Sequence, residues 1–445
     1  MEEQQKSGHL VLVMAPFQGH LTPMLQLATI LHSKGFSITI VHPELNSLNP
    51  SNHPEFTFVS IPDKIKESQL SDEDLADKLK ESLVSNVDVA GSLQSLHKNC
   101  AAPLQKCLEN ILHSHHHIAA VIYDTLMFCA QTIVNELGIP GITLRTSSAT
   151  TMLLFSVLPQ LGEKELMSGI ESPELQALQL QRLRALIVQN PTQAMMEVRA
   201  AFTNAIKFSS AIIVNSMEFL ELDALSKVRQ YFPTPIFTVG PLHKLAPAIC
   251  CSLLTEDDKC ISWLNKQAPK SVIYVSFGSI AIIDKQELIE TAWGLSNSKQ
   301  PFLWVVRPGM VCGSEWIESL PNGFEESVGE RGCIVKWAPQ KEVLAHAANS
   351  TIESICEGVP MLCRPFFGDQ LLNSNYICNV WKIGLELQNL ERGNTVRTIK
   401  RLMVDMEGKD IRKRAMDLKK KAALRLMEDG STSCSFNGLI KQISV

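Results

Sequence analysis

Two residues that could move a proton, His20 and Asp124, each follow an apolar run in the first half of the sequence. The run Leu10–Ala15 ends five residues before His20, and the run Ala119–Tyr123 ends directly at Asp124. If both runs are parallel strands, their carboxyl ends meet at the sheet edge where α/β proteins bind ligands. There an imidazole can accept a proton while a carboxylate fixes its tautomer. The alternative is a loop or capping histidine and a strand-end aspartate with unrelated roles.

A glycine turn follows the apolar run Ser271–Phe277 in the second half of the sequence. Gly278-Ser279 precedes a helical stretch, and the backbone N–H groups of such a turn can bind a phosphate. A plain structural turn would use the same residues. The sequence contains neither G-x-G-x-x-G nor G-x-x-x-x-G-K-[ST], which argues against a dinucleotide oxidoreductase and a P-loop NTPase.

A long ordered run of residues in the last third of the sequence carries the most specific signal. Its parts are Trp337-Ala338-Pro339-Gln340, then Asn349-Ser350-Thr351-Ile352-Glu353-Ser354, and finally Phe367-Gly368-Asp369-Gln370. This run resembles the signature box of the plant secondary-product UDP-glycosyltransferases, the UDP-dependent family 1 with a GT-B fold. Supporting matches lie at Gly19-His20, Asp124, Val275–Ser279 and Phe302–Pro308. The resemblance implies an α/β protein with two Rossmann-like domains that face each other across a cleft.

The resemblance also implies a role for each matching residue. His20 would be the base that deprotonates the acceptor, and Asp124 would orient it. The nucleotide-sugar site would comprise Ser279, Trp337, Ala338, Gln340, Asn349, Ser350, Glu353, Asp369 and Gln370. The uracil would stack on Trp337, and Gln340 would help hold the nucleoside.

The remaining members of this site would bind the ribose, the phosphates and the sugar. Glu353 would accept hydrogen bonds from the ribose hydroxyls, while Asn349, Ser350 and Ser279 would approach the phosphates. Asp369 and Gln370 would bind the donor sugar, and a terminal glutamine resembles the glucose-using members. Taken singly, Trp337 could be a core aromatic residue, Glu353 a helix-surface acid and Gln370 a loop amide.

The implied reaction is an inverting transfer from UDP-glucose to a hydroxyl or carboxyl of a small hydrophobic acceptor. The leaving diphosphate needs N–H-rich or positive surroundings. UDP-glucose is then a co-substrate, and neither a cofactor nor a metal is expected. Acceptor choice would depend on Phe17, Thr146, Ser147 and the stretch Met152–Leu161.

The signature box is shorter here than in the family. It spans 44 positions in the family but 34 residues from Trp337 to Gln370 in this sequence. The missing ten fall between Ala348 and Asn349, where the family has an apolar strand followed by His-Cys-Gly-Trp. A diphosphate contact and a central strand would both be lost. We therefore predict little or no activity for this sequence.

Three origins of the shortening remain open: a gene model that skipped a segment, a decaying duplicate, or a variant that no longer turns over. The alternative function is a non-catalytic protein that binds small molecules and holds the donor poorly.

The composition excludes several other classes of protein. A net charge of −5 over 445 residues provides no basic surface for nucleic acid and no polybasic membrane patch. Twelve cysteines without a C-x-x-C pair favour thiols in a reducing compartment over disulfides or a zinc site. Without a signal peptide, a membrane span or an anchor motif, we expect a cytoplasmic protein. We also expect a monomer, although the sequence has no pattern that reports the oligomeric state.

The length and the hydrophobic pattern predict two α/β domains. We place an acceptor-binding domain at 1–240, a linker at 241–254, a UDP-sugar-binding domain at 255–430 and a C-terminal segment at 431–445 that can return to the first domain. Linker character, with Pro and mixed polarity, already begins at Phe237.

The pattern also predicts individual elements. Strands are expected at Leu10–Ala15, Ser37–Val41, Ala119–Tyr123, Ile142–Leu144, Ala211–Val214, Ser271–Phe277, Phe302–Val306, Cys333–Lys336 and Met361–Arg364. Helices are expected at Pro23–Lys34, with Thr22 as its N-cap, at Leu126–Leu137 and at Asp410–Glu428. The histidines His113, His115, His116 and His117 are assigned to a surface loop.

Overall fold

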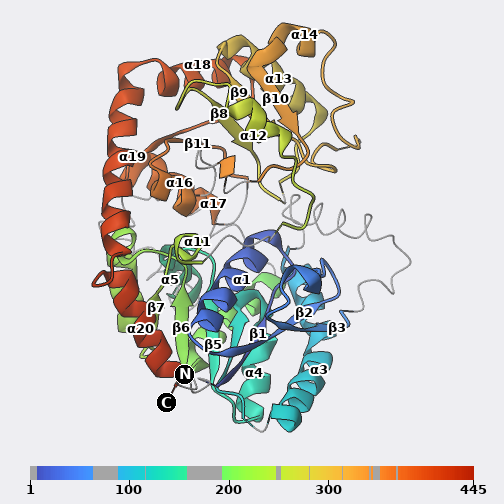
Figure 1. Cartoon of the computed structure of the whole chain (residues 1–445), viewed down its shortest axis with the longest axis vertical. Coiled ribbons are helices and arrows are strands. Elements are labelled where there is room, and N and C mark those ends of the chain that lie inside the picture. Colours follow the sequence, from blue (N-terminus) through green and yellow to red (C-terminus); the bar gives the residue numbers. More distant parts are fainter. Residues whose placement is uncertain are drawn as a thin grey trace, which may run out of the picture. The chain divides into compact units, whose positions relative to one another are not determined.

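The computed structural model describes residues 8–63, 89–115, 117–157, 193–246, 252–279, 281–312, 314–339, 342–343, 351–366 and 369–444. The chain divides into two compact units, each of which is described by itself (Figure 1). Unit 1 contains the described residues up to Leu253 together with Arg425–Val445, and unit 2 contains Leu254–Leu424.

Unit 1 is built on a parallel sheet of seven strands in the order β3-β2-β1-β4-β5-β6-β7 (Figure 1). These strands are β1 (His9–Val13), β2 (Ser37–Pro43), β3 (Thr57–Ile61), β4 (Ala120–Asp124), β5 (Gly141–Arg145), β6 (Ala211–Val214) and β7 (Ile236–Thr238). Every residue of β1, β4, β5 and β6 is buried. Their sequences are largely apolar because helices cover both faces of a parallel sheet.

The two faces of this sheet form separate hydrophobic cores. Leu10 and Leu12 of β1 pack on one face, whereas Val11 and Val13 pack on the other. The helices of unit 1 are α1 (Gln18–Ser33), α3 (Val89–His115), α4 (Cys129–Glu136), α5 (Ala149–Val157), α9 (Gln193–Phe208), α10 (Leu222–Tyr231), α11 (Leu242–Leu245) and α20 (Ser431–Ile443). Short 3-10 turns lie at Pro50–Asn52, Thr125–Met127 and Glu218–Leu220.

The C-terminal helix α20 belongs to unit 1. Phe436 and Leu439 are buried in the same core as β1 and α1. The Thr432 hydroxyl donates to the Gly240 carbonyl at 3.0 Å. The first and the last described residues, 8 and 444, therefore both belong to unit 1.

The described part of unit 2 contains two separate parallel sheets. One has the order β10-β9-β8 and comprises β8 (Ile273–Ser276), β9 (Phe302–Val305) and β10 (Gly332–Val335). The other pairs β11 (Met361–Cys363) with β12 (Gly384–Glu386). The helices are α12 (Lys259–Leu264), α13 (Lys285–Ser298), α14 (Phe324–Val328), α16 (Thr351–Glu357), α17 (Gln370–Asn375), α18 (Arg392–Met403) and α19 (Met406–Arg425), with a 3-10 turn at Gly329–Arg331 and a π-helical turn at Tyr376–Val380.

All nine predicted strands are present, and their observed bounds differ from the predicted ones by at most two residues. Three strands were not predicted, namely β3, β7 and β12. The expected linker from Phe237 is partly wrong, because Phe237 and Thr238 pair with β6. Helix α11 then follows at Leu242–Leu245 and packs beside α1.

The predicted start of the first helix is also wrong. Helix α1 begins at Gln18, and the Phe17 carbonyl accepts hydrogen bonds from the N–H groups of His20 and Leu21 at 2.8 and 2.9 Å. Thr22 is therefore inside the helix, where its hydroxyl accepts a hydrogen bond from the Gln18 side chain at 2.9 Å. His113 and His115 end helix α3 rather than lying in a loop, and His116 is outside the described residues.

Every cysteine in the described part of the chain is a free thiol. Among the described helices, none combines the length and the apolar character that a membrane crossing requires.

Candidate functional site

In unit 1 the structure brings His20 and Asp124 into contact. The Nδ1 atom of His20 lies 2.8 Å from Oδ2 of Asp124. The Asp124 side chain is 1% exposed, whereas the His20 side chain is 25% exposed. The carboxylate is thus buried behind a partly accessible imidazole.

The sheet topology explains why these residues meet. Strand β4 pairs with β1 so that Tyr123 lies opposite Val13, and Asp124 is the last residue of β4. His20 lies in the first turn of α1, which follows β1. On the other side of β4, strand β5 ends at Arg145, and the next residue, Thr146, places its hydroxyl 3.1 Å from His20 Nδ1. Three adjacent parallel strands therefore deliver the three side chains to one edge.

The hydrogen bonds of Asp124 set the tautomer of His20. The second carboxylate oxygen, Oδ1, accepts the N–H of Leu126 at 2.8 Å and so caps the turn Thr125–Met127. A carboxylate accepts hydrogen bonds only, so a neutral His20 carries its proton on Nδ1 and presents Nε2 as the acceptor. This arrangement can take a proton from a bound hydroxyl.

Some of the positions expected to select the acceptor lie near the His20–Asp124 pair, and others lie in the hydrophobic core. The rings of Phe17 and His20 meet edge to face, with centroids 6.1 Å apart. The Ser147 hydroxyl accepts from the Arg145 guanidinium at 3.0 Å. Met152 and Leu153 are buried in the core around β6. Residues 158–161 of the expected stretch lie outside the described residues.

In unit 2 the turn after β8 has the form that the sequence suggests. Gly278 has a φ of 79°, in the left-handed region that favours glycine. Ser279 is half-buried in the same turn. The guanidinium of Arg307 donates to the carbonyls of Gly278 and Ala281. These bonds put a positive charge behind the turn, and the Gly278 N–H donates to the Ser276 hydroxyl at 3.3 Å.

The predicted nucleoside contacts lie around the ends of β10 and α16. Trp337 is half-buried and packs against a cluster that includes Cys260 and Val335, and Ala338 is buried in that cluster. Glu353 lies in the first turn of α16, near Tyr274 of β8. Burial, together with nearby acidic charges that include Glu353, raises the pKa of Tyr274. Gln340, Asn349 and Ser350 lie outside the described residues.

The two predicted sugar contacts stand at the start of α17. Gln370 is its first residue, and its side-chain carbonyl accepts the N–H of Phe366 at 2.9 Å. Asp369 immediately precedes the helix, and its carboxylate accepts from the Asn373 amide at 3.3 Å. The side-chain oxygen of Gln370 is thus used within the chain, and its amide NH₂ group makes no hydrogen bond to any described residue.

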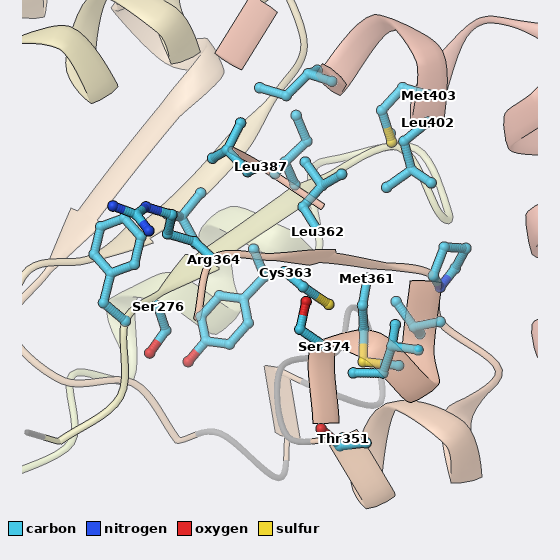
Figure 2. Close-up of a pocket in the computed structure, with 18 of the residues that line it drawn as sticks. Ser276, Thr351, Met361, Leu362, Cys363, Arg364, Ser374, Leu387, Leu402 and Met403 are labelled. Atoms are coloured by element: carbon cyan, nitrogen blue, oxygen red, sulfur yellow. The ribbon is translucent and has the colours of Figure 1, made fainter. Parts of the chain in front are cut away.

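A cavity of about 520 Å³ lies inside unit 2, between β8 and β11 (Figure 2). Gln370 lines it, but Ser279, Trp337, Ala338, Glu353 and Asp369 do not. The cavity is therefore a neighbour of the predicted donor site and not the site itself.

Residues 9–420 match the family described as UDP-glucoronosyl and UDP-glucosyl transferase. The chain belongs to this family. UDP-glycosyltransferase 76B1 of Arabidopsis thaliana is 43% identical over 460 aligned positions, which cover 100% of this chain and 99% of the relative. UDP-glycosyltransferase 76E1 of Solanum lycopersicum is 42% identical, with 99% and 93% covered.

Solved structures of plant enzymes share the fold of this glycosyltransferase. Os79 from O. sativa in complex with UDP superimposes with a TM-score of 0.83 at 24% identity, covering 98% of this chain and 100% of that one. UGT2 of Phytolacca americana, complexed with UDP-2fluoro-glucose and pterostilbene, reaches 0.78 at 24% identity, with 99% and 100% covered. The GT-B fold expected from the sequence is thereby confirmed, and the protein is a plant family 1 UDP-glycosyltransferase.

One residue of this glycosyltransferase acquires a role that the sequence did not suggest. Arg307 belongs to a matching stretch, but no local pattern shows that its side chain, 3% exposed, braces the turn at Gly278. An arginine at the end of an apolar strand would have been the available signal. Among the described residues, no group of His, Cys, Asp or Glu is arranged to hold a metal ion.

Proposed function

We propose that this chain is built to transfer glucose from UDP-glucose, with inversion, to a hydroxyl or carboxyl group of a small apolar plant metabolite. The contact that carries the proposal is the one between His20 Nδ1 and Asp124 Oδ2 at 2.8 Å, in a member of a UDP-sugar transferase family. The reaction needs no metal and no cofactor.

In the proposed reaction His20 acts as the general base. The acceptor O–H bond breaks, and its proton passes to Nε2 of His20. The oxygen attacks the anomeric carbon of the sugar from the face opposite UDP. The bond from that carbon to the diphosphate oxygen breaks, its electron pair stays on UDP, and the linkage is inverted. Asp124 then stabilises the imidazolium that forms.

The donor side rests on the turn at Gly278 and on the residues of the signature box. Arg307 donates to the carbonyls of Gly278 and Ala281, and its positive charge behind the turn would stabilise the charge that grows on the diphosphate as UDP leaves. Glucose as the sugar is favoured by Gln370, whose amide NH₂ group can donate to a sugar hydroxyl. Binding of UDP-2fluoro-glucose by the Phytolacca americana neighbour supports the same donor class.

The acceptor side rests on the surroundings of His20. Phe17 supplies an aromatic ring and Thr146 a hydroxyl beside the imidazole. An apolar acceptor with one reactive oxygen suits such a setting. The neighbour from Phytolacca americana binds pterostilbene, an acceptor of this general kind.

We propose further that this chain turns over poorly, because part of its donor site is missing. Two observations support this. The sheet of unit 2 is divided between β8 and β11, as loss of a central strand would leave it. The alignment with the Arabidopsis relative spans 460 positions against 445 residues here, so the relative has residues without a counterpart in this chain.

The test compares three purified proteins with UDP-glucose and a panel of small hydroxylated acceptors. They are the chain itself, the chain with a ten-residue strand-His-Cys-Gly-Trp segment inserted between Ala348 and Asn349, and that restored chain with His20→Ala. We expect product, with an inverted linkage, mainly from the restored chain, and a large loss with His20→Ala. Robust turnover by the chain as it stands would refute the impairment, and an inert but folded restored chain would refute the transfer.

A non-catalytic small-molecule-binding protein is the second candidate. Two features favour it: the His20–Asp124 pair in unit 1 is complete, whereas the described strands of unit 2 form two separate sheets. UDP is the probe that separates the two functions. If millimolar UDP fails to raise the unfolding temperature even of the restored chain, the binding function is preferred.

A further inference from the structure

The cavity in unit 2 lies in the plane of the sheets, between two strand edges. Its wall includes the seven consecutive residues 272–278 of the β8 segment and the six consecutive residues 361–366 of the β11 segment. Successive side chains of a strand point to opposite faces, so a cavity on one face would be lined by alternate residues. Unbroken runs from both strands therefore place the cavity between their edges (Figure 2).

The edge of β8 that faces away from β9 carries backbone hydrogen-bonding groups. The N–H of Ile273 donates to the Pro301 carbonyl, at the start of β9, at 2.9 Å. In a parallel strand, alternate residues direct their N–H and C=O groups to opposite neighbours. The backbone groups of Tyr274 therefore point away from β9. Because β8 ends its sheet, they point to the side of the cavity.

The same reasoning applies to β11. The N–H of Met361 donates to Ile383 at 3.2 Å, and the C=O of Cys363 accepts from Leu387 at 2.8 Å, so both face β12. The backbone groups of Leu362, between them, face the opposite edge. Two edges thus present donors and acceptors toward one space.

The two strands run in the same direction along the cavity. Phe277 follows β8 by one residue and Phe366 follows β11 by three, and their rings meet edge to face with centroids 5.7 Å apart. The carboxyl ends of the strands are therefore together. At the other end, residues that precede the two strands, Val272 and Pro360, line the same cavity. A strand placed between them could pair in parallel on both sides.

The side chains around the cavity are mainly apolar. Figure 2 shows Leu362, Leu387 and Met403 among them. Two hydroxyls in the wall, those of Thr291 and Thr395, are buried and have no hydrogen-bond partner among the described residues. The cavity therefore suits an occupant with an apolar surface and a polar backbone.

We propose that the cavity between β8 and β11, called the slot from here on, binds one extended apolar peptide segment as an added parallel strand. A strand is the occupant that can bond to both edges at once, because a helix satisfies its own backbone groups and a small apolar molecule offers none. A segment of about seven residues, about 23 Å long, matches the lined length. The proposal goes beyond the proposed function, since binding requires neither donor nor acceptor.

The test uses the full chain and a synthetic peptide. The probe is a capped, fluorescently labelled decapeptide with a central run of Val, Ile and Thr and a lysine at each end for solubility. Its control has the same sequence with two adjacent central amides N-methylated, which removes one donor toward each edge and keeps the side chains. We expect saturable one-to-one binding by fluorescence anisotropy, and binding at least tenfold weaker for the methylated peptide. Equal affinity of the two peptides, or no binding at all, would overturn the proposal.

A protein variant checks the position of the peptide. Leu362→Pro removes an N–H on the cavity side and leaves the bond of Met361 to β12 in place. Leu362→Val is the matched control, because it shortens the side chain and keeps the N–H. We expect at least tenfold weaker peptide binding for the proline variant, with the circular dichroism of the parent. A folded proline variant that binds like the valine variant contradicts the placement, and if the proline variant is unfolded the two peptides decide.

Peptide binding and glucose transfer are measured separately, so that they can fail separately. If the probe binds and the restored chain is inert, the peptide-binding proposal is supported and the transferase proposal is refuted. If the restored chain is active and the probe does not bind, only the peptide-binding proposal is refuted.

Discussion

Replacing Asp124 by asparagine is expected to reverse the tautomer of His20. In the parent chain Asp124 Oδ2 lies 2.8 Å from His20 Nδ1, and Oδ1 accepts the Leu126 N–H at 2.8 Å. The asparagine carbonyl can keep the bond to Leu126, which turns the NH₂ group toward His20. An NH₂ group cannot accept the Nδ1 proton, so that proton is expected to move to Nε2.

The expected losses of kcat and of folding stability can be estimated from the change in these two hydrogen bonds. With its proton on Nε2, His20 cannot take the proton of an acceptor. The equivalent exchange in a Ser-His-Asp triad lowers kcat about 10⁴-fold, which is about 5.4 kcal/mol on the barrier. The fold should lose about 1–2 kcal/mol, because one charge-assisted hydrogen bond becomes a neutral one while the cap on Leu126 remains.

The assay reads the tautomer directly and does not require turnover. Long-range ¹H–¹⁵N spectra of histidine-labelled chain distinguish the protonated from the unprotonated ring nitrogen, and His20→Gln assigns the signal. We expect Nδ1–H in the parent and Nε2–H in Asp124→Asn. Thr146→Val is the control, since it removes the 3.1 Å contact to the same nitrogen and should keep the parent tautomer. An unchanged tautomer in Asp124→Asn would refute the reasoning. The loss of kcat is measured separately, by comparing the restored chain with and without Asp124→Asn.

Three further predictions concern the donor unit and the pH dependence of stability. Inserting the ten-residue segment after Ala348 should make the unfolding temperature respond to UDP, and a flat UDP titration of a folded protein would count against a missing donor element. Arg307→Met should lower the free energy of unfolding in urea by about 3 kcal/mol, because the carbonyls of Gly278 and Ala281 lose a charged donor. Arg307→Lys keeps the charge and should lower this free energy less. Equal urea midpoints for the parent and the Met variant would contradict the prediction. Burial lowers the pKa of His97 from 6.5 to about 3. Between those values the unfolded chain binds the extra proton, so stability should fall as the pH drops below about 6.5, and His97→Gln should show a shallower fall between pH 7.5 and 5.

The strands show how far the sequence alone predicts this fold. β1 and β4 were recognisable because a parallel strand covered on both faces is a continuous apolar run. β3, at the edge of the sheet, mixes exposed and buried positions, and β12 has three residues. Neither has a distinctive local pattern, so their strand state depends on pairing with a neighbour.

The start of α1 shows where a local rule was overridden. Thr22-Pro23 is a good helix-start signal, yet the helix begins at Gln18 because the Phe17 carbonyl accepts the first bonds. This shift places His20 in the first helical turn, so the position of the proposed base depends on packing rather than on the capping residues.

The sequence by itself determined the family, through one ordered run of residues, and named His20 and Asp124 as partners although 104 positions separate them. It also showed that the run is ten residues short of the family pattern. Only the tertiary structure decided that Thr146 joins the pair, that Arg307 braces the turn at Gly278, and that a cavity divides β8 from β11. Residue types and spacings are local properties, whereas such contacts depend on strand order and on the packing of helices against both faces of each sheet.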